Sequence, residues 1–142
     1  MIQVQRYRQR VSGPLLDRID LHLEVPAVSY SEMSRAEPGE SSASIRRRVL
    51  RARALQSARL GGGARCNGRM RPGEIRQHCA LDSGGAALLQ AAVHSLNLSA
   101  RAYDRILKVA RTIADLEEAS RIEAPHLQEA VSYRSLDREV WK

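Results

Sequence analysis

The sequence predicts an all-α protein, a small helical bundle of about five helices preceded by a flexible tail with one orphan strand. Apolar residues recur at helical spacing in several stretches after about residue 40, and capping residues or prolines stand where these stretches begin. Only one stretch alternates apolar and polar residues as a strand does. Because the 142 residues are 43% hydrophobic but include no Phe, the core must be built from aliphatic side chains.

The first 40 residues form the predicted tail. The stretch PLLDRI (14–19) is typical of a short turn of helix, and DLHLEV (20–25) of a strand. An unpaired strand is not stable alone, and the chain contains no second convincing strand, so we expect the rest of its sheet to lie outside this sequence. Residues 26–42 are rich in Ser, Pro, Gly and Glu, a linker composition. We therefore divide the chain into residues 1–40, expected to be disordered in isolation, and a helical domain, 41–142.

Two helices are expected in the first half of the helical domain. Ser41 or Ser42 can cap a helix that runs to about Leu60, where a run of three glycines breaks it. Its apolar stripe consists of Ile45, Val49, Ala52 and Leu55. Pro72 suits the first turn of a second, short helix with the sequence PGEIRQHC (72–79).

Three more helices follow. Asp82 can cap the third, Ser99 can cap the longest, over about 100–118, and the last starts near Pro125 and ends around Tyr133. The residues that recur at helical spacing are Ala86, Leu89, Val93 and Leu96, an apolar stripe, in the third helix; Tyr103, Ile106, Leu107, Ala110, Ile113, Ala114 and Glu117, on one side of the longest; and Leu127, Ala130 and Val131 in the last.

Composition argues against several classes of protein. No run of about 18 apolar residues exists, and no apolar stretch follows the N-terminal arginines, so we expect neither a membrane span nor a signal peptide, and a cytoplasmic protein. The two cysteines, Cys66 and Cys79, form no CxxC element, and the four histidines are scattered. We expect no metal site and no disulfide.

The net charge of +7 is concentrated in the first half of the chain. Within the helix expected after Ser41, Arg46, Arg47, Arg48 and Arg51 could contact DNA phosphates, since several cations along one helix bind nucleic acid without sequence preference. No aromatic residue interleaves with them, so stacking on single-stranded bases has no platform. A solvated helix face or a subunit contact explains the same pattern and is the simpler interpretation.

The chain lacks the residues that grip a nucleotide. Its two lysines, Lys108 and Lys142, do not follow a glycine, so the phosphate-binding pattern GxxxxGK[ST] is not satisfied. The serines, histidines and acidic residues show no spacing typical of a nucleophile or a carboxylate pair. We therefore expect the chain alone neither to bind ATP tightly nor to hydrolyse it.

Three blocks, RYRQRVSGPLLDRIDLHLEVP, PGESSASIRRRV and LSARAYDRILKVARTIADL, resemble the C-terminal portion of the magnesium-chelatase-like AAA+ ATPases, closest to the ComM competence branch. The similarity runs from about Tyr7 to Arg138. It implies that residues 1–40 are the end of the AAA+ core plus a linker, and that the helical bundle is the AAA+ lid. The nucleotide-binding loop and the acidic metal-coordinating strand of that family would lie upstream.

The resemblance also implies roles for three arginines. Arg18 would be the arginine finger that reaches the nucleotide of a neighbouring subunit, and Arg101 the sensor-2 arginine that contacts the nucleotide of its own subunit, with Arg105 as second choice. Arg101 lies in the first turn of the Ser99-capped helix, where a cation is unfavourable unless an anion such as phosphate lies opposite. Surface ion pairing of Arg18 with Asp17 or Asp20, and a solvated basic face for the other two, remain the alternatives.

The function implied for the full-length protein is that of a homo-hexameric ATPase that uses ATP and Mg²⁺, translocates on DNA and aids branch migration during integration of foreign DNA. Its partners would be the rest of the AAA+ core, neighbouring subunits and DNA. Two alternatives stay open. The chain could belong to the motor-type subunit of a magnesium chelatase for tetrapyrroles, or it could be a free-standing basic helical module that binds DNA or protein and has an ordered N-terminus.

Overall fold

The computed structural model describes residues 15, 18–34 and 39–134. Within them the helices are α3 (Tyr30–Ser34), α4 (Ser42–Arg59), the 3₁₀ turn η1 (Asn67–Arg69), α5 (Pro72–His78), α6 (Ser83–Leu96), α7 (Ala100–Leu116) and α8 (Ala124–Ser132). No strand occurs in these described residues. The all-α helical bundle predicted from the sequence is therefore confirmed.

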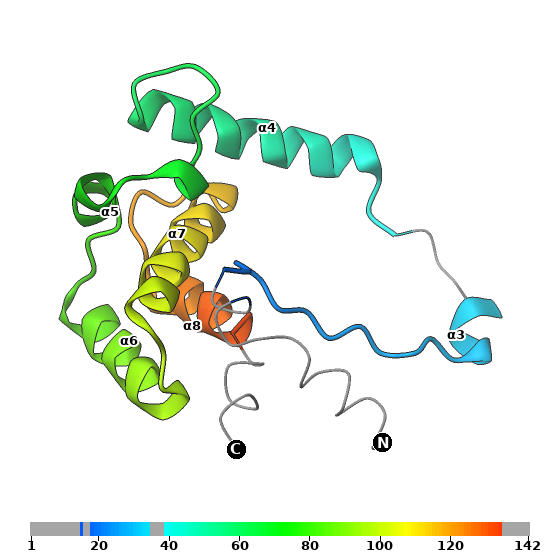
Figure 1. Ribbon diagram of the computed structural model, residues 1–142. Helices are drawn as coiled ribbons and strands as arrows, with labels where there is room; N and C mark the ends of the chain where they lie inside the picture. Colours follow the sequence, from blue (N-terminus) through cyan, green and yellow to red (C-terminus); the bar gives the residue numbers. More distant parts are fainter. Residues whose placement is uncertain (1–14, 16–17, 35–38, 135–142) are drawn as a thin grey trace.

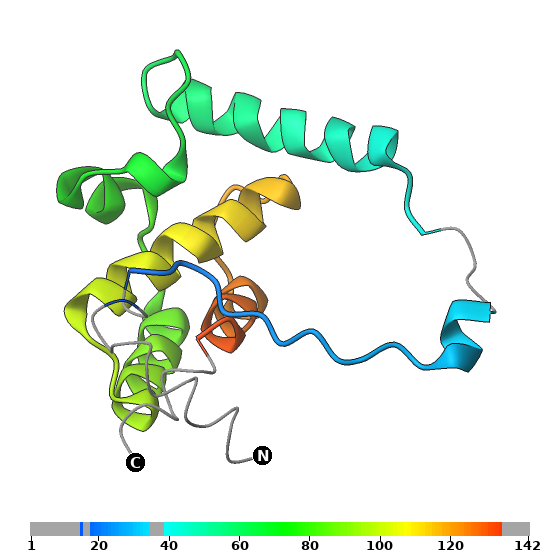
Figure 2. The same cartoon turned by 45° about the vertical axis from the view of Figure 1, so that its right-hand side comes forward.

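Helix α7 is the centre of the bundle. It packs against α8, α4, α5 and η1, and α6 packs against α8 (Figures 1 and 2). The buried side of α7 combines apolar residues, three of them alanines that let neighbouring helices approach closely, with two charged residues, Arg111 and Asp115. The buried core comprises Leu60, Met70, Ile75, Cys79, Leu89, Ile106, Leu107, Ala110, Ile113, Ile122, Leu127 and Ala130.

Side-chain caps set where three helices begin. Ser41 Oγ accepts the Ser44 backbone N–H at 3.3 Å, and Asp82 Oδ1 accepts the Gly85 N–H at 2.7 Å. Ser99 Oγ accepts the Ala102 N–H at 3.2 Å. Each bond satisfies a backbone donor that has no partner inside the helix. The predicted starts of α4, α6 and α7 follow from these caps, and α5 begins at its predicted proline.

A glycine allows α6 to approach α8 closely. Gly85 is buried, and a Cβ built on it would lie 3.1 Å from Leu127 Cδ1. Ala86, expected in the apolar stripe of this helix, is exposed, because the face turned toward α8 starts one residue earlier, at Gly85. Leu89 and Leu96 are buried as expected.

The first half of α4 extends away from the bundle (Figures 1 and 2). Only Ala52 and Gln56 of α4 are buried, while Ile45, Val49 and Leu55 are each at least 40% exposed. The apolar stripe expected here is therefore largely uncovered by the described residues. On the side of α7 where residues recur at helical spacing, Tyr103 is 40% exposed, and Glu117, which follows the last residue of the helix, is exposed.

The segment before α4 was only partly predicted. Residues 19–29 form neither helix nor strand, so the strand predicted over residues 20–25 is not formed here. The physical reason is that no second strand pairs with it among the described residues. The linker composition of residues 26–42 did not predict α3. Of the turn expected over 14–19, residues 14, 16 and 17 lie outside the described residues.

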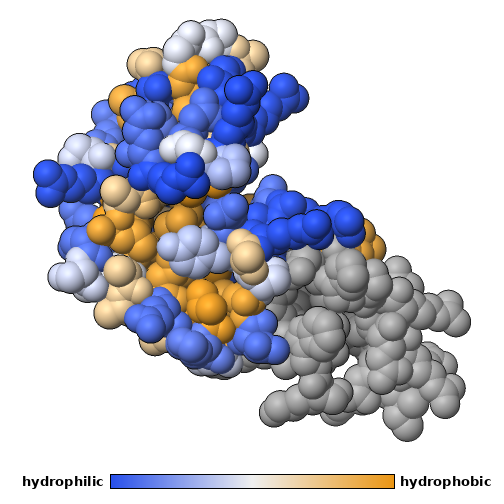
Figure 3. All heavy atoms as spheres, turned by 60° about the vertical axis from the view of Figure 1, so that its left-hand side comes forward, coloured by the Kyte–Doolittle hydropathy of each residue, from blue (hydrophilic) through white to orange (hydrophobic). Residues whose placement is uncertain are grey.

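Among the described helices, none combines the length and apolar character needed to cross a membrane. Figure 3 shows the face toward α5 and α6, where apolar side chains (orange) lie among hydrophilic ones (blue). The surface of this face is mixed.

Candidate functional site

The two candidate sensor arginines lie on the first two turns of α7. Arg101 is exposed next to the Ser99 cap, where the helix N-terminus concentrates partial positive charge. The Arg105 side chain, one turn further, is 27% exposed and forms an ion pair with the carboxylate of Asp20. The carboxylate of Asp20 is thus paired with Arg105 in this structure, while Arg101 is exposed to solvent.

Arg18, the candidate finger, lies in an exposed turn two residues before Asp20, and its backbone N–H donates to the Leu15 carbonyl at 3.0 Å. Because Asp20 pairs with Arg105, the structure brings the Arg18 segment next to the start of α7. Figure 2 shows this segment (dark blue) passing across α7. The two candidate elements, widely separated in sequence, are therefore neighbours.

The same segment is also attached to the end of α8, a contact that sequence reasoning missed. The His22 N–H donates to the Tyr133 carbonyl at 2.8 Å, and the Arg134 guanidinium donates to the carbonyl of Ile19. The Arg134 side chain is 1% exposed and His22 is 5% exposed. We call Ile19–His22, with its contacts to Arg105, Tyr133 and Arg134, the strap. No periodicity or motif in the sequence signals it.

The four arginines proposed for DNA lie on the projecting half of α4, and all are exposed. Arg48 forms a bidentate contact with Glu40, at 2.9 and 3.1 Å, which holds the pKa of that carboxyl below its usual range. Arg51 pairs with Glu118 at 3.1 Å. Arg46 and Arg47 form no ion pair with any described residue.

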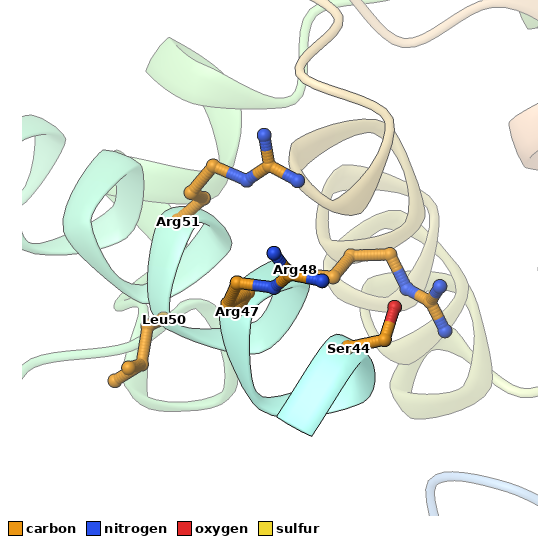
Figure 4. A pocket seen from close by; sticks show the side chains of 5 residues that line it. All are labelled: Ser44, Arg47, Arg48, Leu50 and Arg51. Atoms are coloured by element: carbon orange, nitrogen blue, oxygen red, sulfur yellow. The ribbon is translucent and has the colours of Figure 1, made fainter. Parts of the chain in front are cut away.

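A surface pocket lies on the same helix. Its lining residues are Ser44, Arg47, Arg48, Leu50 and Arg51. In Figure 4 the guanidinium groups of Arg48 and Arg51 extend from one side of α4 and Leu50 from another. The concentration of guanidinium groups here suits an anionic ligand, although two of the three already have carboxylate partners in the chain.

A buried polar network ties α4, η1 and α7 together. The Asp115 carboxylate, fully buried, accepts hydrogen bonds from both terminal nitrogens of Arg59, from Asn67 Nδ2 at 2.8 Å and from Arg111 Nε at 3.1 Å. Arg111 also donates to the Ser120 and Ala119 carbonyls at 3.1 and 2.6 Å. Burial lowers the pKa of Arg111, and the Asp115 carboxylate beside it opposes this shift. Sequence reasoning missed this network, whose one signal is the i,i+4 spacing of Arg111 and Asp115.

A histidine closes the N-terminus of α8. His126 Nδ1 accepts the Glu123 backbone N–H at 2.9 Å, and Nε2 lies 2.9 Å from Glu117 Oε2. The first bond requires an unprotonated Nδ1, so in the neutral ring the proton is on Nε2 and points at Glu117. This arrangement caps α8 and joins it to the end of α7.

The cysteines are free thiols. Burial raises the pKa of Cys79 to about 11. Burial also acts to raise that of Cys66, but hydrogen bonds from Arg53 and from the Arg69 and Gly68 backbone outweigh it and leave the pKa below its usual value. Among the described residues, no group of three or more His, Cys, Asp or Glu could hold a metal ion.

Two family models match the sequence. Residues 39–134 match "Magnesium chelatase, subunit ChlI C-terminal" and residues 1–33 match "Magnesium chelatase, subunit ChlI". The change from one model to the other falls between the strap and α4, so the strap contacts connect segments that belong to different models.

Curated relatives match nearly the whole chain. The competence protein ComM of Haemophilus influenzae is 43% identical over 141 residues, 99% of this chain and 27% of the relative. The uncharacterized protein YifB of Escherichia coli is 47% identical over 137 residues, 96% of this chain and 26% of the relative. An uncharacterized protein of Mycobacterium bovis is 33% identical over 131 residues, 92% of this chain and 26% of the relative. The chain thus spans about a quarter of the length of these relatives.

Proposed function

Because the chain belongs to the magnesium chelatase ChlI C-terminal family, we propose that it is the lid portion of a ComM-like AAA+ ATPase. The observation that carries the proposal is the 43% identity to a competence protein over 99% of the chain. The helical bundle of residues 42–132 is an architecture suited to a lid. ATP and Mg²⁺ would be held by the upstream core, and this chain would contribute arginine donors. The full-length protein would form a homo-hexamer that acts on DNA.

In this proposal Arg101 contacts the nucleotide of its own subunit. Its exposed position in the first turn of α7 is unfavourable for a cation by up to about 1 kcal/mol, and a phosphate group opposite would reverse the sign of that effect. Arg105 lies on the same face but is paired with Asp20 in this structure. Arg101 is therefore the stronger candidate of the two.

Arg18 would act on the neighbouring subunit. A guanidinium is permanently charged and presents a planar donor fork, which suits the charge that develops on a transferring phosphoryl group. Its position on an exposed turn, beside a segment fixed to the bundle, would allow it to reach outward from its own subunit.

Steady-state ATPase kinetics of the full-length protein test both roles. Arg101→Ala should raise the KM for ATP, and Arg18→Ala should lower kcat by about 10³-fold, as expected for loss of a finger. Arg76→Ala, an exposed arginine on α5, serves as the matched control. In mixed rings, an Arg18→Ala subunit should impair turnover at its neighbour's site. Unchanged turnover in both variants would refute the proposal.

We propose contact with DNA through α4 as the second part of the function. Arg46 and Arg47 support it, because they are exposed and no described acidic side chain neutralises them. Charge reversal at Arg46 and Arg47 should weaken DNA binding by the full-length protein and reduce the slope of log affinity against log salt by roughly 2. Arg48→Gln is the internal comparison, with a smaller expected effect because Glu40 already neutralises that side chain. An unchanged salt slope would refute contact of Arg46 and Arg47 with DNA.

A further inference from the structure

We infer that Arg134 is a positioning residue for Arg18: by fixing the strap to the end of α8, it makes the placement of the finger depend on the lid. The inference rests on the proposed function, because it assumes that Arg18 acts on a neighbouring nucleotide. It adds a residue at the far end of the chain to the machinery. The supporting observations are the burial of Arg134, the atoms it contacts and the way three contacts meet on one short segment.

Arg134 contacts the backbone of the strap. Arg134 is 1% exposed, and its guanidinium donates to the carbonyl of Ile19, the residue directly after Arg18. Burying a guanidinium is unfavourable unless hydrogen bonds compensate it, and the Ile19 carbonyl supplies one such bond. A hydrogen bond to a main-chain carbonyl restrains the position of the backbone, whereas a bond to a side chain restrains only that side chain. The backbone next to Arg18 is therefore held directly.

Two further contacts attach the strap to the bundle. The His22 N–H donates to the Tyr133 carbonyl at 2.8 Å. His22 lies three residues after Ile19, and Tyr133 directly precedes Arg134. The Asp20 carboxylate pairs with Arg105 on α7. The strap is thus fixed at both its ends to the exit of α8 and in its middle to the start of α7. These contacts restrict movement of the strap relative to the bundle.

This arrangement connects Arg101 and Arg18, the two arginines proposed to contact nucleotides. Arg105 lies one turn after Arg101 on α7, and its partner Asp20 lies two residues after Arg18. A movement of α7 when phosphate binds opposite Arg101 would be transmitted through Asp20 to the Arg18 turn, while Arg134 keeps the other side of the strap fixed. The strap would then report the nucleotide state of one subunit to the site on the next.

Amide exchange on the 142-residue chain tests the attachment. In Arg134→Gln, protection of the His22 amide should fall by about ten-fold or more, while protection within α7 is retained. Arg121→Gln, an exposed arginine in the α7–α8 connection, is the matched control and should leave the His22 amide unchanged. If Arg134→Gln does not fold, Asp20→Asn, whose side chain is 60% exposed, provides a second test with the same expected direction. Unchanged protection of His22 in the folded variants would refute the strap.

Kinetics of the full-length protein test the coupling to Arg18. Arg134→Gln should lower kcat by roughly 10- to 100-fold with little change in the KM for ATP, as expected for a displaced catalytic group. Arg134→Lys, which retains a donor, should recover part of the loss. Combined with Arg18→Ala, Arg134→Gln should cause no further decrease, because the group it positions is gone.

The outcomes separate the two ideas. If Arg18→Ala is itself without effect, the finger assignment fails and the strap loses its purpose. If Arg18→Ala is impaired but Arg134→Gln turns over normally, the finger assignment stands and the positioning role of Arg134 is refuted. A fully additive double variant would show that Arg134 acts on stability and not through Arg18.

Discussion

Replacing Asp115 by Asn should destabilise the chain more than any surface change. The carboxylate is fully buried and is the shared acceptor for Arg59, Asn67 and Arg111. Asparagine preserves the shape but removes the negative charge, so two guanidinium groups would face each other without a counter-ion. Removing one partner of a buried ion pair costs about 3–5 kcal/mol.

The structure places the expected value toward the lower end of that range. The Arg59 side chain is 19% exposed and can gain some hydration when its partner is lost, whereas that of Arg111 is 3% exposed and cannot. We therefore expect a loss of about 3 kcal/mol, which for a chain of this size lowers the Tm by roughly 6–12 °C. Chemical denaturation followed by far-UV circular dichroism measures the free energy of unfolding directly.

The matched control is Glu118→Gln. This change breaks the ion pair between Glu118 and Arg51. Because the two side chains are 54% and 64% exposed, respectively, the expected loss of unfolding free energy is below about 1 kcal/mol. A loss for Asp115→Asn as small as that of the control would refute the reasoning. A double-mutant cycle with Arg59→Gln adds a second check, with an expected coupling energy of about 0.5–3 kcal/mol.

Four further predictions concern single side chains. Iodoacetamide should modify Cys66 in the native chain and leave Cys79 unmodified, because only the first combines partial exposure with a lowered pKa. Burial raises the pKa of Cys79 from its ordinary value of 9.0 to about 11 in the folded chain, so its contribution to stability is complete below pH 9 and is lost as pH rises toward 11. Ser99→Ala should remove the α7 cap and about 1 kcal/mol of unfolding free energy, and Leu89→Ala, at a site 1% exposed, about 2–5 kcal/mol.

Each of these has a direct check, which for Ser99→Ala and Leu89→Ala is the free energy of unfolding from chemical denaturation. Mass spectrometry after partial alkylation locates the modified cysteine, and labelling of Cys79 before unfolding would contradict its burial. Unfolding free energies of the native chain and of Cys79→Ala, compared from pH 8 to 11, should diverge in slope, and parallel curves would disprove the linkage. Ser95→Ala is the control for Ser99, since its hydroxyl bonds within α6 and caps nothing.

Local signals predicted most of the fold. Ser41, Asp82 and Ser99 each carry an oxygen that meets a backbone donor three residues later, and this geometry depends only on neighbouring residues. The glycines after Leu60 end α4 for the same local reason, since Gly61 adopts a positive φ of 83°. Five helices therefore could be located from the sequence.

Burial could not be predicted equally well, because it depends on which elements meet. Ile45 and Val49 have the spacing of a core face, but the described residues leave that face uncovered. Conversely, Asp115 and Gln56 are polar residues that the structure buries, since their partners come from other elements. Periodicity indicates that a face is apolar and does not indicate what covers it.

The candidate site was predicted in parts. Arg18, Arg101 and Arg105 were selected from the resemblance, and their roles stay predictions, as does the division at residue 40. The strap was not predictable, because two of its contacts involve the backbone carbonyls of Ile19 and Tyr133, which any residue type could offer. Only the three-dimensional path of the chain shows that Arg134 lies beside the segment that carries Arg18.

The projecting half of α4 has a consequence for how the helix behaves in solution. An isolated helix of about ten residues is marginal in water, and packing holds only the part of α4 near Ala52 and Gln56. The ion pair between Glu40 and Arg48 tightens the first turns but is solvent-exposed. The outer turns should therefore fold and unfold readily when nothing packs against them. The helical content of α4 should then rise when a binding partner contacts this end of the molecule.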